Sequence, residues 1–153
     1  MTKTGDNSKK ALTEALNGAL ADHLALYVKT KNFHWHVRGP RFRDLHLLFD
    51  EQAQQILSVT DAIAERVRKN DADTLTSIGA IGKATRLKDE DSTSLDADRM
   101  IEQLKDDNET LAVRLKQVQD ASEEAGDNAT SGVVDEWTDL AEERVWFLRQ
   151  ALR

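Results

Sequence analysis

Proline is almost absent from this chain. The 153 residues include one proline, Pro40, and seven glycines, so long stretches lack the two residues that most often interrupt a helix. Within those stretches apolar residues recur every three or four positions, which is the spacing of a helix that buries one face. The sequence therefore predicts an all-α protein.

The first half of the chain predicts two long helices. The first runs from Ser8, a suitable N-cap, to about His36, and Gly39-Pro40 ends it because proline starts a helix but does not continue one. The second runs without a break for about 28 residues, from Phe42 to Lys69. The connection between these two helices is short.

The second half predicts a crossover and two more helices. Residues 71–98 carry a weaker apolar pattern interrupted by glycines, which indicates a long crossover with one short helix. A third helix follows Ser94 and ends near Ser122, residues 123–132 form a loop, and a fourth helix begins at Val133. One long crossover among short connections is typical of a ferritin-like four-helix bundle. We expect one such domain over residues 8–153, after a flexible tail of residues 1–7.

Composition restricts the kinds of site and partner. The chain has no cysteine, so nitrogen and oxygen atoms must supply any metal ligands. A net charge of -7 favours cations over phosphates. No stretch approaches the roughly 20 apolar residues that a membrane span needs, so we expect a soluble, cytoplasmic protein with no membrane partner.

Four metal-ligand residues share one face of the predicted second helix. They are separated by 4, 11 and 4 residues and, at about 100° per residue, project within a third of the helix circumference. They are His46, Asp50, Asp61 and Glu65. Eleven helical residues span about 16 Å, so the His46/Asp50 pair and the Asp61/Glu65 pair cannot bind the same ion within one chain.

Two antiparallel copies of this helix, related by a twofold axis, would place one pair opposite the other. The spacing therefore predicts a dimer with two metal sites, each shared between subunits. Imidazole and carboxylate together suit Fe(II), Mn(II) or Zn(II), and iron is the leading choice because several carboxylates also retain Fe(III). The Glu-x-x-His motifs of a site inside one bundle are absent.

The residues around the first turn resemble a known family. The run Asn32-Phe-His-Trp-His-Val-Arg-Gly39, followed by Leu45-His46, Asp50 and Asp61-Ala-Ile-Ala-Glu65, resembles the signature of the Dps mini-ferritins. This resemblance implies a hollow dodecamer of identical subunits that oxidises Fe(II) with hydrogen peroxide and stores the ferric mineral. It also implies protection of DNA from oxidative damage.

The same resemblance assigns roles to individual residues. His34, His46 and Asp50 would bind iron from one subunit, and Asp61 and Glu65 from its partner. Trp35 would lie near the iron and donate an electron. His36 points away from His34 on a regular helix and is not expected to be a ligand, and His23, among apolar residues, is expected to have a packing role.

Acidic residues near the third loop form a separate candidate site. By resemblance, mini-ferritins line a threefold iron-entry pore with carboxylates in this region, and the candidates here are Glu124, Asp127, Asp135 and Asp139. Gly132 and Ala129 occupy positions where acids are expected. Exposed acids at helix ends, without a pore, are an equally good interpretation.

DNA binding is the second function that the resemblance implies. Lys3, Lys9 and Lys10 are the basic residues near the N-terminus, and Asp6 offsets part of their charge. Each subunit could neutralise few phosphates, although twelve tails on one cage would add avidity. We therefore expect weak, salt-sensitive DNA binding, and keep as an alternative a nucleoid-associated, DNA-compacting protein with a secondary iron site.

Overall fold

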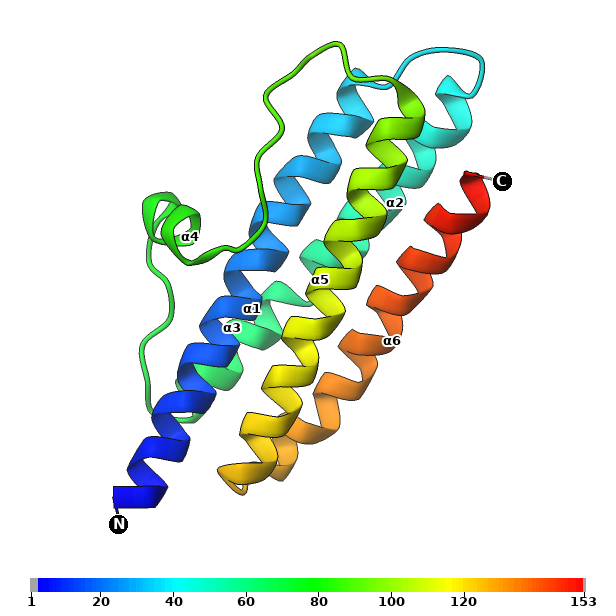
Figure 1. Ribbon diagram of the computed structural model, residues 1–153. Helices are drawn as coiled ribbons and strands as arrows, with labels where there is room; N and C mark the ends of the chain where they lie inside the picture. The colour runs from blue at the N-terminus through cyan, green and yellow to red at the C-terminus, as the bar shows by residue number, and fades with distance from the viewer. Residues whose placement is uncertain (1–2, 153) are drawn as a thin grey trace.

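The structure is a four-helix bundle with one long crossover, and the computed structural model describes residues 3–152. In Figure 1, α1 and α6 run in one direction, while α2, α3 and α5 run in the other. The described helices are α1 (Lys3–His36), α2 (Phe42–Ser58), α3 (Thr60–Lys69), α4 (Ile78–Ala84), α5 (Ala97–Glu124) and α6 (Asn128–Ala151). The all-α, ferritin-like prediction is confirmed, including the short helix within the crossover.

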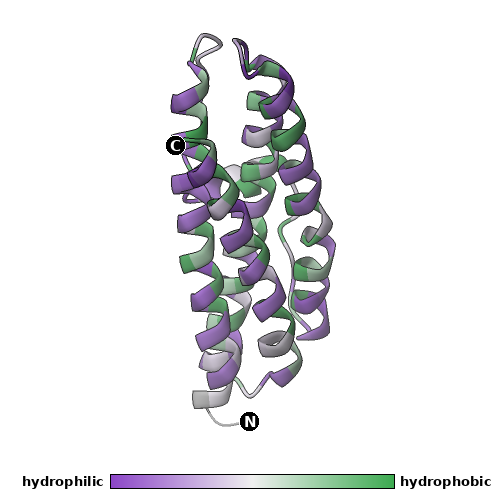
Figure 2. Cartoon of the chain, turned by 90° about the vertical axis from the view of Figure 1, so that its right-hand side faces the viewer, coloured by the Kyte–Doolittle hydropathy of each residue, from purple (hydrophilic) through white to green (hydrophobic). Residues whose placement is uncertain are grey.

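Each long helix buries one face in the bundle. Figure 2 shows polar and apolar residues alternating along the helices. The buried apolar side chains form two clusters, one containing Leu16, Ile63 and Trp137 and the other containing Phe33 and Phe49. Burying a large apolar side chain contributes about 1.5–3 kcal/mol, so the two clusters fix how the helices pack. No helix among residues 3–152 is long and apolar enough to span a membrane.

The first helix begins earlier than the sequence indicated. Helix α1 starts at Lys3, well before the predicted N-cap Ser8, so residues 3–7 are helical. The stretch contains no proline, so the helix continues outward even though Gly5, Asp6 and Asn7 have low helix propensity. Of the predicted tail, residues 1–2 lie outside the described residues, and the boundary at residue 7 stays a prediction.

The prediction of one continuous second helix was wrong, because the helix is interrupted at Val59. The Ser58 hydroxyl donates to the Gln55 carbonyl at 2.6 Å, and the Thr60 hydroxyl donates to the Leu57 carbonyl at 2.8 Å. Serine and threonine side chains compete in this way with backbone hydrogen bonds and distort helices. The break separates the two predicted ligand pairs, with His46 and Asp50 on α2 and Asp61 and Glu65 on α3.

Two further helix ends differ from the prediction. The N-cap of α5 is Asp96, whose side chain accepts from the Arg99 N–H, rather than Ser94. Helix α6 begins at Asn128, so most of the predicted loop over 123–132 is helical. In both cases an aspartate side chain accepts from one free N–H group of the first turn. The polar residues on either side of each aspartate made these helix starts look like loop in the sequence.

Buried polar contacts tie the long crossover to α1. The carboxylate of Asp22, fully buried on α1, accepts from the Thr85 hydroxyl at 2.7 Å and from the Arg86 N–H at 2.9 Å. Its other oxygen accepts from Nε of Arg114 on α5 at 2.9 Å. A single carboxylate therefore joins two long helices to the segment that follows α4.

Candidate metal centre

His34 and His46 hold each other in place where α1 and α2 meet. The turn between the helices closes with a hydrogen bond from the Phe42 N–H to the Gly39 carbonyl at 3.0 Å, and Gly39 adopts a φ of 112°, which glycine tolerates best. The two imidazoles stack with ring centroids 3.8 Å apart. Nδ1 of His34 bonds the His46 carbonyl at 2.6 Å, and Nδ1 of His46 bonds the His34 carbonyl at 2.7 Å.

These reciprocal bonds fix the chemistry of both rings. A backbone carbonyl only accepts hydrogen bonds, so Nδ1 of each ring carries the proton. In the neutral imidazole the lone pair then lies on Nε2, and this is the form that binds metal ions. The fold therefore presents two imidazoles with the correct tautomer and a fixed ring orientation.

Asp50 adds a carboxylate beside this pair. It lies one helical turn after His46 on α2, and its Oδ1 is 4.0 Å from Nε2 of His34. The same oxygen accepts from Nζ of Lys31 at 2.8 Å. That hydrogen bond is the main reason why the pKa of Asp50 lies below its ordinary value, so the carboxylate is ionised at neutral pH and attracts cations.

Asp61 and Glu65 form a second, separate acidic pair on α3. They lie one turn apart and both are exposed. The pKa of Glu65 is raised because its protonated carboxyl group can donate a hydrogen bond to Asp61, and because the two negative charges repel each other. A cation between two carboxylates that repel each other relieves this repulsion, so the pair is suited to binding one. From Asp50 to Asp61 the helix path is about 16 Å long, so this pair cannot reach the imidazoles of its own subunit.

The predicted ligands thus lie in two places within one subunit. His34, His46 and Asp50 are close to one another, whereas Asp61 and Glu65 are on the far side of the break at Val59. Within the described part of a single chain, no group of three or more ligand-type side chains is arranged to hold a metal ion. Completion by a second subunit stays a prediction.

Three other residues of α1 have distinct environments. Trp35 is 62% exposed, so its ring is available on the surface beside the histidine pair. His36 bonds the carbonyl and side chain of Asn32 through Nδ1. His23 is fully buried and bonds the Ala19 carbonyl at 2.7 Å, and burial is the main cause that lowers its pKa to about 4. It is a neutral residue of the bundle interior.

Among the candidate pore residues, Asp127 has a different role within the subunit. Its carboxylate caps α6 through the Thr130 N–H and accepts from Arg66 at 3.0 Å and from Asn70 at 2.8 Å. Burial opposes its ionisation, but the hydrogen bonds outweigh burial and hold the pKa far below its ordinary range. The other three candidates, Glu124, Asp135 and Asp139, are exposed.

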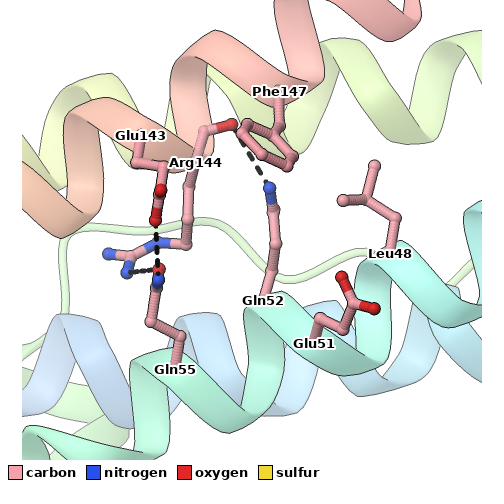
Figure 3. A pocket seen from close by; sticks show the side chains of 7 residues that line it. All are labelled: Leu48, Glu51, Gln52, Gln55, Glu143, Arg144 and Phe147. Carbon is pink, nitrogen blue, oxygen red and sulfur yellow. Dashed lines mark hydrogen bonds between the residues drawn. The ribbon is translucent and has the colours of Figure 1, made fainter.

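Sequence reasoning missed a polar layer inside the bundle. Figure 3 shows Gln52 and Gln55 of α2 reaching toward Arg144 of α6. The Arg144 guanidinium is almost fully buried and donates to Asn108 and Gln55, each at 2.7 Å. A cavity of about 100 Å³ lies beside these side chains. The signal was present, because Arg144 lies at helical spacing between Ala141 and Leu148 on the buried face.

The bundle, its crossover and the histidine–carboxylate arrangement define a ferritin-like protein. The family model of the ferritin-like domain matches residues 13–153. The DNA protection during starvation protein of Brevibacillus brevis is 33% identical over 137 residues, which cover 90% of this chain and 91% of that protein. This chain belongs to the Dps family.

Solved structures of Dps proteins show the same fold. The Dps of Thermosynechococcus elongatus superimposes with a TM-score of 0.94 at 27% identity, covering 97% of this chain and 94% of that one. The Dps of Vibrio cholerae, described as a member of a broad superfamily of ferritin-like diiron-carboxylate proteins, gives a TM-score of 0.90 at 27% identity, with 96% and 92% covered.

Proposed function

We propose that this protein is a ferroxidase that oxidises Fe(II) with hydrogen peroxide at sites shared between two subunits and stores the ferric product. The observation that carries the proposal is the reciprocal His34/His46 pair, which uses Nδ1 of each ring and leaves the Nε2 lone pairs for a metal ion, with Nε2 of His34 4.0 Å from Asp50. Nitrogen ligands next to carboxylates suit Fe(II), and additional carboxylates suit Fe(III). The membership of a related Dps protein in the diiron-carboxylate superfamily supports iron as the metal.

The second half of each site would come from a neighbouring copy of the chain. In a twofold dimer, Asp61 and Glu65 of the partner subunit would face His34, His46 and Asp50. We propose that such dimers assemble into a hollow dodecamer. The exposed acids Glu124, Asp135 and Asp139 are candidates for an entry pore, where carboxylates would concentrate Fe(II), whereas the contacts of Asp127 favour a role in capping α6.

The proposed reaction consumes both species that generate radicals. Two Fe(II) ions each lose one electron, and one peroxide molecule accepts both electrons and two protons and leaves as two molecules of water. We propose that Trp35, whose ring is exposed, donates the second electron if only one iron is oxidised. We propose that the protein protects DNA by removing iron and peroxide together. The name of the Brevibacillus brevis relative describes DNA protection for that protein.

Anaerobic loading with Fe(II), followed by peroxide, tests this function. We expect the rate of ferric absorbance increase to fall by at least about tenfold in His46→Ala and in Glu65→Ala, because each removes a ligand from every site. Glu102→Ala, which removes an exposed carboxylate of α5, is the matched control and should oxidise iron at the wild-type rate. Wild-type rates in both ligand variants would show that the assigned site is wrong.

A further inference from the structure

Lys31 lies against the candidate ligand Asp50, and the proposed reaction does not use it. Its Nζ is 2.8 Å from Oδ1 of Asp50, the same oxygen that lies 4.0 Å from Nε2 of His34. The Lys31 side chain is only 16% exposed, although lysine is usually one of the most exposed residues. The ammonium therefore lies where an incoming cation would meet this carboxylate.

A metal ion and this ammonium compete for one oxygen atom. A carboxylate oxygen that already accepts a charge-assisted hydrogen bond from Lys31 is less available as a ligand. A divalent ion beside His34 would also lie close to the ammonium, and like charges at short range repel. Both effects act in the same direction, so Lys31 must leave Asp50 when a metal binds.

The ring of Trp35 can contact the Lys31 ammonium after the ammonium leaves Asp50. Trp35 follows Lys31 by one helical turn, and its ring centroid is 5.9 Å from Nζ. This distance is at the outer limit of a cation–π contact, so a small rotation of the lysine side chain would strengthen that contact. Lys31 can therefore leave the carboxylate without losing every favourable partner.

We propose that Lys31 is a positioning residue that acts as a placeholder for the metal ion: it holds Asp50 toward His34 in the metal-free dimer and is displaced when a divalent ion enters. This inference rests on the proposed function, because it requires Asp50 to be a ligand. The placeholder weakens the binding of the ion, and a weakly held ion passes more readily from the site to the stored mineral.

Binding of Co(II) to the assembled protein, without iron or peroxide, tests the inference. The visible absorbance of bound Co(II) reports affinity directly and is independent of catalysis. Lys31→Met is expected to bind Co(II) about five- to tenfold more tightly than the wild type, since a competing charge-assisted hydrogen bond is lost. Lys31→Arg keeps the charge and should stay within about twofold of the wild type.

The controls separate this inference from the proposed function. Lys116→Met removes an exposed lysine of α5 and should leave the affinity unchanged. Should Lys31→Met fail to assemble, Lys31→Gln, which also lacks the charge, provides the same comparison with Lys31→Arg. Equal or weaker Co(II) binding by the uncharged variants, with His46→Ala still abolishing binding, would overturn the placeholder role alone. Binding that does not depend on His46 would overturn the site itself.

Discussion

His34 and His46 each depend on the other for orientation. Each ring is held by the backbone carbonyl of the other residue, so a shift of one helix end would disturb both ligands. The spacing along the second helix predicted that His46 and Asp50 share one face, and the resemblance to the Dps signature added His34 to them. Neither predicted the reciprocal bonds, which depend on the conformation of the turn that includes Gly39.

Among single residues, Asp127 is expected to contribute strongly to the stability of the fold. Its partly buried carboxylate accepts from Arg66, Asn70 and Thr130, so Asp127→Asn should cost about 1–3 kcal/mol at neutral pH. For a chain of this length, that corresponds to a decrease in the thermal midpoint of several degrees. Asp135→Asn, which replaces an exposed aspartate on α6, should change the midpoint little.

The same residue predicts a dependence on pH. A carboxyl group whose pKa is lower in the folded state stabilises that state above its unfolded pKa of about 3.9, and the contribution is lost as the pH falls below that value. Because the pKa of Asp127 is depressed, the difference in thermal midpoint between wild type and Asp127→Asn should shrink between pH 5 and pH 3. Circular dichroism can follow both proteins, and a difference that stays constant over this range would contradict the assignment.

At the scale of elements, the spacing of apolar residues predicted each long helix but did not predict where a helix is interrupted. Apolar spacing reports which face is buried, and that face continues from Ile56 through Val59 to Ile63. The break at Val59 arises instead from the hydroxyls of Ser58 and Thr60, which take backbone carbonyls. Arg144 is likewise a charged residue at a buried position of α6, where the spacing predicts an apolar one. Burial lowers its pKa to about 10, so it remains charged at neutral pH.

Alanine substitutions at two glycines test how the crossover is attached to α1. Gly18 is buried on α1, and a Cβ there would clash with the Arg114 guanidinium that bonds Asp22. Gly132 on α6 has open space around it. Alanine normally stabilises a helix by about 1 kcal/mol relative to glycine. We expect Gly132→Ala to raise the free energy of unfolding, and Gly18→Ala to lower it by about 1–3 kcal/mol.

Two measurements check this pair. Chemical denaturation at one protein concentration gives the two changes in stability. Amide exchange reports the attachment itself, because the Arg86 N–H donates to Asp22 and should exchange faster in Gly18→Ala. If Gly18→Ala stabilises the protein as much as Gly132→Ala does, the Asp22–Arg114 contact does not hold the crossover.

At the scale of the whole molecule, charge argues against DNA as the main partner. Each subunit carries a net charge of -7, and binding to phosphates must overcome that charge with few lysines. A gel-shift titration of the assembled protein should therefore show little retention of DNA at about 50 mM salt and none at about 150 mM. Retention at both salt concentrations would favour the DNA-compacting alternative over the iron chemistry.

The proposed assembly requires the two ligand pairs to meet between two copies of the chain. Spacing along the chain separates the two ligand pairs, and the folded subunit keeps them on two sides of the break at Val59. Which surfaces meet in an oligomer depends on the complementarity of two copies, and apolar periodicity does not report this. The proposed dodecamer predicts a particle with twelve times the subunit mass of 17.2 kDa.

Complementation between two inactive variants tests the shared site most directly. Equal amounts of His46→Ala and Glu65→Ala subunits are unfolded, mixed and reassembled, and Fe(II) oxidation by peroxide is then measured. In a twofold dimer that contains one subunit of each kind, one of the two sites has all of its ligands. Since about half of the dimers are mixed, a shared site predicts about a quarter of the wild-type rate. No activity above that of the separate variants, from particles of the correct mass, would contradict it.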